Sequence, residues 1–345
     1  MQEASGRDSA AELAAILADY RLGEIDPITA QTIEGFARNV QEICTWMGDD
    51  ELRVFLSGLR NCIGRQYWSR ARVEALFTSQ TFDSTPDLHI VHIQEDESSQ
   101  ATFVKLLKQS SEGRGDETQG LNTRRLLYVD DATFTGRALA RNLQLLYDRL
   151  ALFGPSQREL LVFHLLQFEN EVYPRIEPAV RELESIGVRV KFQSAALDQT
   201  HSTNDQHLRL SPTTAMLQED YCRRFLGSHT SLKAMRDDDS GVCLAWPDRG
   251  ADPLFDSPME RQVVTRALLQ VGAKIRAWTA NWNALMRPLG FVAGIRDASL
   301  GFGTTFCTFH NSANTSPLAL WWGNPDEGTH SALSKWTPLL PRRPQ

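Results

Sequence analysis

Apolar positions recur at helical spacing over the first quarter of the chain. Asp26 followed by Pro27 predicts an N-cap and a first helical position, ahead of a helix through ITAQTIEGFARNVQEICTWM. The segments ELRVFLSGLRNCI and SRARVEALF continue the helical pattern. We therefore expect a helical N-terminal region over residues 1–84.

The pattern changes after residue 85, where short apolar runs alternate with helical segments. The runs are LHIVHI (88–93), RLLYV (125–129), ELLVFHLL (159–166) and VRVKFQS (188–194). This alternation predicts neighbouring parallel strands that begin at Leu88, Arg125, Glu159 and Val188, joined by right-handed connections. The fold class is therefore α/β, with a parallel-sheet core over residues 85–195.

The rest of the chain divides into a polar segment and an apolar one. Residues 196–257 are rich in polar and turn-forming residues, which indicates an irregular insertion or hood. Ser257 and Pro258 then predict the start of a long helix. We expect residues 258–345 to supply this helix and a glycine-bounded strand that completes the core.

Composition narrows the class of protein. The 345 residues carry a net charge of -7, with a pI near 5.7, which argues against duplex nucleic acid as a partner. Five cysteines without a CxxC pair indicate neither a zinc site nor a disulfide framework. There is no signal-peptide pattern or membrane-length apolar run, so a cytoplasmic protein with no membrane partner is expected.

The stretch VDDATFTG, which begins at Val129, carries the clearest chemistry. Asp130 and Asp131 end an apolar strand, and a helical pattern begins soon afterwards. Backbone amides of a short loop at a helix start can bind one phosphate. Carboxylates beside a phosphate suit a ligand that also offers hydroxyls or a metal, as ribose 5-phosphate does. The predicted phosphate loop consists of Ala132, Thr133, Phe134, Thr135 and Gly136.

This stretch resembles the phosphoribosyl pyrophosphate (PRPP) motif of type I phosphoribosyltransferases. The segment GFGTTFCTFHNSANTSPLALWW resembles the closing segment of phosphoribosyltransferase-like effectors in prokaryotic conflict (anti-phage) systems. The resemblance implies that Asp130 and Asp131 are catalytic parts that bind the ribose hydroxyls and Mg²⁺. It also implies that the loop of residues 132–136 holds the 5-phosphate of PRPP or a related nucleotide, and that a protein partner is encoded in a defence operon.

Several neighbouring residues allow two interpretations each. Arg137 either strengthens phosphate binding or covers the loop. Ser98 and Ser99, where the family has its pyrophosphate loop, either donate to the ligand or cap a helix, and residues 95–97 are acidic enough to repel a diphosphate without magnesium. Arg114 lies where type I enzymes have a mobile catalytic loop, although a solvated surface charge is the commoner situation.

Three functions remain open on the sequence. The first is a phosphoribosyltransferase-like enzyme acting on a small-molecule sugar phosphate or nucleotide with Mg²⁺. The second is a sensor that keeps the sugar-phosphate pocket but performs no transfer. The third is an interaction scaffold that uses the long C-terminal helix to contact a partner.

Overall fold

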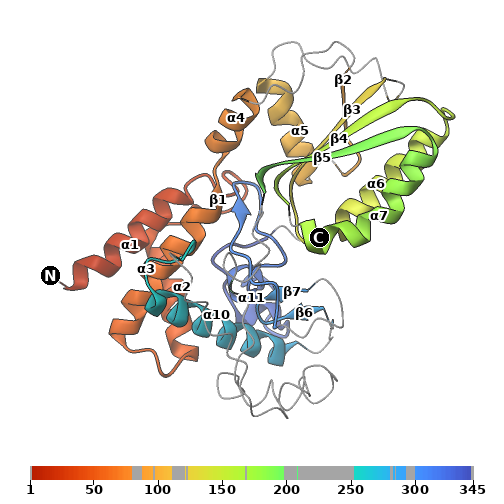
Figure 1. Ribbon diagram of the computed structural model, residues 1–345. Helices are drawn as coiled ribbons and strands as arrows, with labels where there is room; N and C mark the ends of the chain where they lie inside the picture. Colours follow the sequence, from red (N-terminus) through yellow and green to blue (C-terminus); the bar gives the residue numbers. More distant parts are fainter. Residues whose placement is uncertain are drawn as a thin grey trace. The chain divides into compact units, whose positions relative to one another are not determined.

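The computed structural model describes residues 2–79, 88–95, 98–110, 121, 123–167, 169–197, 208, 252–279, 283, 285–292 and 300–342. The chain divides into two compact units (Figure 1). The first unit consists of residues 1–69 and 202–345, and the second consists of residues 70–201.

A four-stranded sheet forms the centre of the second unit. Its strands are β2 (Leu88–Val91), β3 (Arg125–Thr133), β4 (Arg158–Gln167) and β5 (Val188–Leu197), and they lie side by side in chain order. All three neighbouring pairs are parallel. The predicted parallel α/β core is therefore confirmed.

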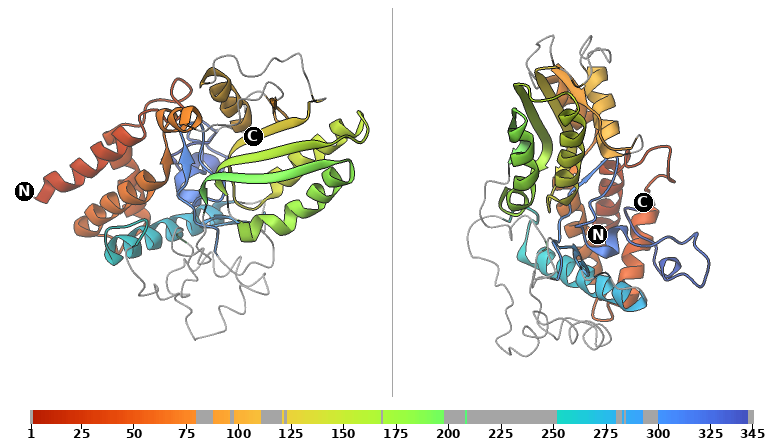
Figure 2. Two further views of the ribbon diagram at one scale, coloured as in Figure 1. Left: turned by 45° about the horizontal axis from the view of Figure 1, so that its top comes forward. Right: turned by 90° about the vertical axis from the view of Figure 1, so that its right-hand side faces the viewer.

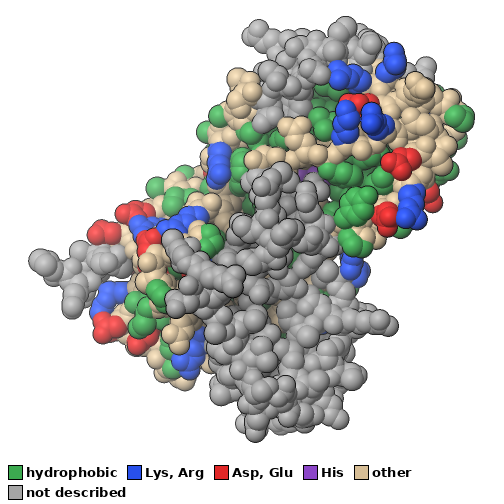
Figure 3. All heavy atoms as spheres, in the orientation of Figure 1, with side chains coloured by type: hydrophobic (Ala, Val, Ile, Leu, Met, Phe, Trp, Pro, Cys, Tyr) green, Lys and Arg blue, Asp and Glu red, His purple; other side chains and the backbone are tan. Residues whose placement is uncertain are grey.

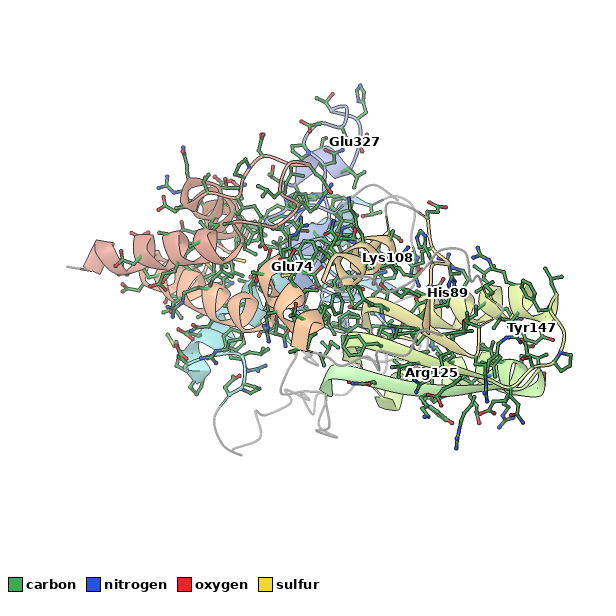
Figure 4. All side chains as sticks on the ribbon, turned by 90° about the horizontal axis from the view of Figure 1, so that it is seen from above. Glu74, His89, Lys108, Arg125, Tyr147 and Glu327 are labelled. Carbon is green, nitrogen blue, oxygen red and sulfur yellow. The ribbon has the colours of Figure 1, made fainter. Side chains whose placement is uncertain are left out.

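Helices cover both faces of this sheet. On one face, Phe77 of α4 (Arg70–Ser79) contacts Phe103 of α5 (Ser99–Ser110) and Phe163 of β4. On the other face, α6 (Arg137–Ala151) packs with α7 (Glu169–Ser185), and Asn142 of α6 donates a hydrogen bond to Tyr128. The right-hand view of Figure 2 shows the sheet between the orange helices and the green ones. Figure 4 shows Lys108, near the end of α5, close to His89 of β2.

The helix positions also decide the handedness of the connections. The strands follow chain order, so all three connections step across the sheet in the same direction. Because α6 and α7 share one face and α5 lies on the other, the connection through α5 has the opposite hand to the other two. The prediction of three right-handed connections is therefore wrong for this sheet. On its face of the sheet, α5 packs against α4 through the contact between Phe103 and Phe77.

The first unit is mainly helical. Its long helices are α1 (Gln2–Ile16), α2 (Ala30–Ile43), α3 (Asp49–Gln66) and α10 (Pro258–Trp278), with the shorter α11 (Leu318–Trp321) and a 3₁₀ helix, η4 (Leu333–Lys335). Strand β1 (Tyr67–Trp68) pairs in parallel with β8 (Cys307–Thr308), and β6 (Met286–Arg287) pairs in antiparallel with β7 (Gly290–Phe291). The helices and these short strands share one core.

Helix α10 packs closely on α3 because one glycine leaves room for it. A Cβ atom on Gly58 would lie 2.7 Å from Cγ2 of Val264, so a larger residue would push the helices apart. Beside this contact, the buried Glu260 carboxylate accepts hydrogen bonds from Ser57 Oγ at 2.7 Å and from Asn61 Nδ2 at 2.9 Å. The N- and C-terminal parts of the chain thus share one interior.

Several boundaries differ from the sequence predictions. Helix α2 is capped by Thr29, whose side chain accepts from Thr32, and not by Asp26. Helix α1 lies in the expected helical N-terminal region, although its bounds were not predicted because its start is polar. Ser257 caps α10 as expected, with Pro258 in its first turn.

The predicted division into four segments also differs from the observed one. The N-terminal helices and residues 258–345 belong to one unit, and α4 belongs to the other. Strand β8 pairs with β1 and does not complete the four-stranded sheet, because the C-terminal part of the chain packs with the N-terminal helices. Of the predicted insertion at 196–257, only β5 residues 196 and 197, residue 208 and residues 252–257 lie within the described part of the chain.

No helix in the described ranges has both the length and the apolar character needed to cross a membrane. Cys44, Cys62 and Cys307 are buried free thiols. Burial raises the pKa of the Cys44 and Cys62 thiols to about 12, so these thiols are protonated at neutral pH.

Candidate functional site

The acidic pair lies on β3, at the carboxyl edge of the sheet, where ligands bind in open α/β folds. The strand is longer than predicted. Ala132 and Thr133, expected in the phosphate loop, pair instead with Leu166 and Gln167 of β4. The turn into α6 therefore contains only residues 134–136, because the backbone of the first two predicted loop residues is used by the sheet.

Asp130 is the centre of a hydrogen-bond network. It is 7% exposed, and its Oδ1 accepts from Ser99 Oγ at 2.8 Å and from the backbone N–H of Asp131 at 2.9 Å. Its Oδ2 accepts from Gln94 Nε2 at 2.7 Å and from Tyr128 Oη at 2.9 Å. A carboxylate offers about four acceptor positions, so the protein itself satisfies this group.

The network extends beneath Asp130 into α6 and β4. Tyr128 Oη accepts from Asn142 Nδ2 at 2.8 Å, and both residues are buried. His164 lies opposite Asp130 in the strand register, and its ring centroid is 6.0 Å from that of Tyr128. Sequence reasoning missed Gln94, Tyr128, Asn142 and His164. Their only signal was a polar residue inside an apolar run, as at His164 in ELLVFHLL.

Burial keeps the two ring side chains of this network neutral. It raises the pKa of Tyr128 well above its usual value, and the neighbouring Asp130 charge acts in the same direction. Burial lowers the pKa of His164 to about 4, although the Asp130 charge opposes this shift. At neutral pH, Tyr128 is therefore a hydrogen-bond donor and His164 an uncharged imidazole.

The turn between β2 and α5 is also held from within. Gln100 is fully buried, and its Oε1 accepts from the backbone N–H groups of Ile93 and Gln94, both at 2.9 Å. Its Nε2 lies 3.4 Å from the carbonyl oxygen of Val91. Two of the turn amides that a diphosphate would need thus already have a protein acceptor.

The two serines of this turn have structural partners. Ser98 Oγ accepts from the N–H of Ala101 at 3.2 Å, so it caps the first turn of α5. Ser99 Oγ donates to Asp130. The capping interpretation is therefore confirmed for Ser98, and Ser99 positions the acidic residue. Asp96, Glu97 and Arg114 lie outside the described residues.

The start of α6 is suited to an anion. Its N-cap is Gly136, with φ of 71°, which offers no side-chain cap to the first-turn amides. A Cβ atom there would lie 3.0 Å from the carbonyl oxygen of Val172, so glycine is favoured by space as well as by φ. Arg137 is exposed, Thr135 is half-buried and Phe134 is buried. The predicted anion loop is thus reduced to its last three residues.

The two acids differ in how well they suit a metal. Mg²⁺ in nucleotide sites is usually held by one or two carboxylates together with substrate phosphates. Asp131 is half-buried, and its Oδ1 accepts from the N–H of Ala132 at 2.6 Å. It fits the role of a single protein ligand. Asp130 does not fit, because four protein donors already occupy its oxygens.

The site consists of a parallel strand that carries two acidic residues and a following helix whose N-cap is a glycine. The comparison with protein families agrees with this arrangement. The PRTase-CE family model matches residues 43–342, which include parts of both units. The chain belongs to the PRTase-CE family. The members of this family are phosphoribosyltransferase-like conflict effectors. The comparisons with curated proteins and with solved structures gave no match.

The PRTase-CE match confirms the resemblance that the motif and the C-terminal segment indicated. It covers the acidic pair, the turn into α6 and the buried segment around residues 300–316. Within that segment, Asn311 Oδ1 accepts from the N–H of Ser312 at 3.0 Å, so this asparagine serves a turn. The two tryptophans that follow this segment serve packing, since Trp321 stacks on Phe291 and Trp322 is buried.

Proposed function

We propose that this PRTase-CE chain is an enzyme that binds a ribose 5-phosphate ligand, such as PRPP or a related nucleotide, at the carboxyl edge of β3. One observation carries the proposal. A rigid hydrogen-bond network fixes the acidic end of β3 directly before a helix start whose N-cap offers no side-chain oxygen. This pairing of an acidic residue and an anion site suits a ligand with both hydroxyls and a phosphate.

The residues have separate tasks in this proposal. The amides at the start of α6, with Thr135 and Arg137, hold the 5-phosphate. Asp131 accepts from the ribose hydroxyls or holds Mg²⁺, which when bound neutralises the charge of a diphosphate. Asp130 is a positioning residue, because its four donors fix the backbone from which Asp131 projects. Ser99 and Gln94 act through Asp130.

Transfer from such a ligand breaks the bond between C1 of the ribose and its leaving group while an acceptor bonds to C1. The protein's part is to hold the sugar in place and to stabilise positive charge developing on its ring. Asp131 supplies that negative charge. Tyr128 and His164 are buried and neutral, so their part is to keep the β3 end rigid and dry.

Titration calorimetry with PRPP, with and without Mg²⁺, followed by product analysis, tests the proposal. Asp131→Asn should weaken binding at least tenfold and stop turnover, because an amide cannot supply a two-oxygen anion. Gly136→Ala should weaken binding of ribose 5-phosphate as well as of PRPP. Unchanged binding in both folded variants would exclude this edge as the ligand site.

Gly154→Ala is the matched control. Gly154 also has a positive φ, of 73°, and lies just after α6, but a Cβ atom there meets nothing within 4 Å. The two alanines would have a similar positive φ, but only Gly136→Ala also crowds the carbonyl oxygen of Val172, so circular dichroism must confirm the fold of both variants. Only the variant at Gly136 should lose ligand affinity, which separates an effect on the ligand from a general loss of stability.

A sensor without transfer chemistry is the second candidate, and the β2–α5 turn favours it. Gln100 already binds two amides of the turn that holds pyrophosphate in type I enzymes. A sensor would bind ribose 5-phosphate about as tightly as PRPP and would release no pyrophosphate. An enzyme would bind PRPP more tightly and turn it over.

A further inference from the structure

The opposite, amino edge of the same sheet is strongly basic. Arg125 begins β3, Arg158 begins β4 and Arg189 follows the first residue of β5. Arg124 directly precedes β3, and its carbonyl oxygen accepts from the N–H of Glu159 at 2.7 Å. Because the strands are parallel and in register, their amino ends bring these four arginines to one place.

A pocket of about 560 Å³ lies at this edge. Its volume is within the usual range for small-molecule sites and exceeds what one inorganic phosphate needs. All its lining residues belong to the second unit: Arg124, Arg125, Gln157, Arg158, Glu159, Gly187 and Arg189. The lining residues thus include four arginines and a single acidic residue.

That carboxylate does not neutralise the pocket. Glu159 lies between Arg125 and Arg189 in the strand register, and it also forms an ion pair with Lys191 at 2.9 Å. Figure 3 shows Lys and Arg side chains gathered around an acidic one over the strands labelled β3 to β5 in Figure 1. Arg125 is labelled in Figure 4, beside the strands of the sheet.

Arg158 provides a second, independent observation. It is 4% exposed, and none of its three guanidinium nitrogens has a hydrogen-bond partner within the described structure. A buried charge is normally paired, because leaving water without a partner costs much free energy. An unpaired buried guanidinium at a basic pocket indicates that an anion completes the arrangement.

We propose that the arginine pocket at the amino edge, formed by Arg124, Arg125, Arg158 and Arg189, binds a small molecule that carries two or more phosphate groups, such as a nucleoside triphosphate. Arginine suits phosphate because its planar fork can donate two parallel hydrogen bonds. The four guanidinium groups match several negative charges. The chain's net charge of -7 disfavours an extended nucleic acid as the occupant.

The pocket is separate from the ribose-phosphate site, because the amino and carboxyl ends of parallel strands lie at opposite edges of a sheet. The ligand there would act as an effector and not as the substrate. The inference does not depend on the proposed function, and different variants test the two.

Calorimetric titration of the full chain with ATP, and separately with inorganic triphosphate, tests this inference in buffer without divalent ions. We expect both to bind the parent. Arg158→Met should weaken binding at least tenfold, because several charge-assisted hydrogen bonds are lost. Arg189→Ala, at an exposed position where folding is not at risk, should weaken binding severalfold.

Two controls complete the experiment. Arg181→Ala removes an exposed arginine of α7 that pairs with Glu177 at 2.7 Å outside the pocket, and should bind like the parent. Gly136→Ala alters only the other edge and should bind inorganic triphosphate, which has no ribose, like the parent. Failure of the parent to bind either probe, or equal binding by the parent, Arg158→Met and Arg189→Ala, would refute the proposal. Tighter binding of an oligonucleotide than of ATP, lost in Arg158→Met, would refute it in favour of nucleic acid.

Discussion

The two edges of the four-stranded sheet differ in how far the protein satisfies a buried charged side chain with hydrogen bonds. At the carboxyl edge, the Asp130 carboxylate accepts four hydrogen bonds from the protein. At the amino edge, the buried Arg158 guanidinium makes none within the described structure. Both charges belong to one sheet, so the difference does not come from a different fold.

This contrast separates a charge that stabilises the protein from a charge that requires a ligand. The donors around Asp130 come from β3, from the β2–α5 connection and from the first residue of α5, so this carboxylate holds several segments in place. Among the described residues, the Arg158 guanidinium has no hydrogen-bond partner, and an unpaired buried charge opposes folding. Stability measurements can therefore test the comparison before any ligand is known.

The largest effect is expected for Asp130→Asn. The amide nitrogen cannot accept hydrogen bonds, so at least one buried donor loses its partner and the charge-assisted bonds weaken. The free energy of unfolding should fall by about 4 kcal/mol. Urea unfolding followed by circular dichroism measures this. Asp131→Asn is the control, with an expected loss below about 1 kcal/mol; equal losses would show that the network is not what stabilises this edge.

The next largest effect is a dependence of the protein's stability on pH, caused by His164. Its pKa is about 4 in the folded protein and ordinarily 6.5, so between these values the unfolded chain binds a proton that the folded one does not. The contribution of neutral His164 to the free energy of unfolding is complete above pH 6.5 and is lost as the pH falls towards 4. The shift corresponds to at most about 3 kcal/mol.

His164→Gln removes this titration. Urea unfolding of the parent and the variant at pH 7.0, 5.5 and 4.5 should show a shallower loss of stability in the variant on acidification. The carboxyl groups titrate equally in both proteins. The difference between the two curves therefore gives the contribution of the His164 imidazole to the pH dependence of stability. Parallel curves would mean that His164 is not buried in its neutral form.

The smallest effect has the opposite sign. Arg158→Met should raise the free energy of unfolding of the ligand-free protein by about 2 kcal/mol, because it replaces an unpaired buried charge with an apolar side chain of similar length. Thermal unfolding without polyphosphate measures this. A variant that is clearly less stable than the parent would show that Arg158 already has a partner, and the contrast between the edges would disappear.

Much of the second unit could be predicted from the sequence because its signals are local. Short apolar runs separated by helical patterns specified the strands, and adjacent acids before a Thr-Gly pair located the carboxyl edge. The network could not be predicted, because Gln94, Ser99 and Asn142 reach Asp130 and Tyr128 only after separate segments pack together. A polar residue in a turn or a helix carries no sign of which partner its side chain will have in the folded protein.

The sequence by itself determined the parallel α/β class, the positions of the strands and the acidic, glycine-bearing motif, since each depends on spacing along the chain. Only the tertiary structure decided that the N- and C-terminal parts share one unit, that α5 covers the face opposite α6, and that four arginines meet at one edge. It also decided that Asp130 is satisfied by the protein while Asp131 fits a ligand. Hydrogen-bond saturation depends on neighbours from several elements, and no local pattern contains that information.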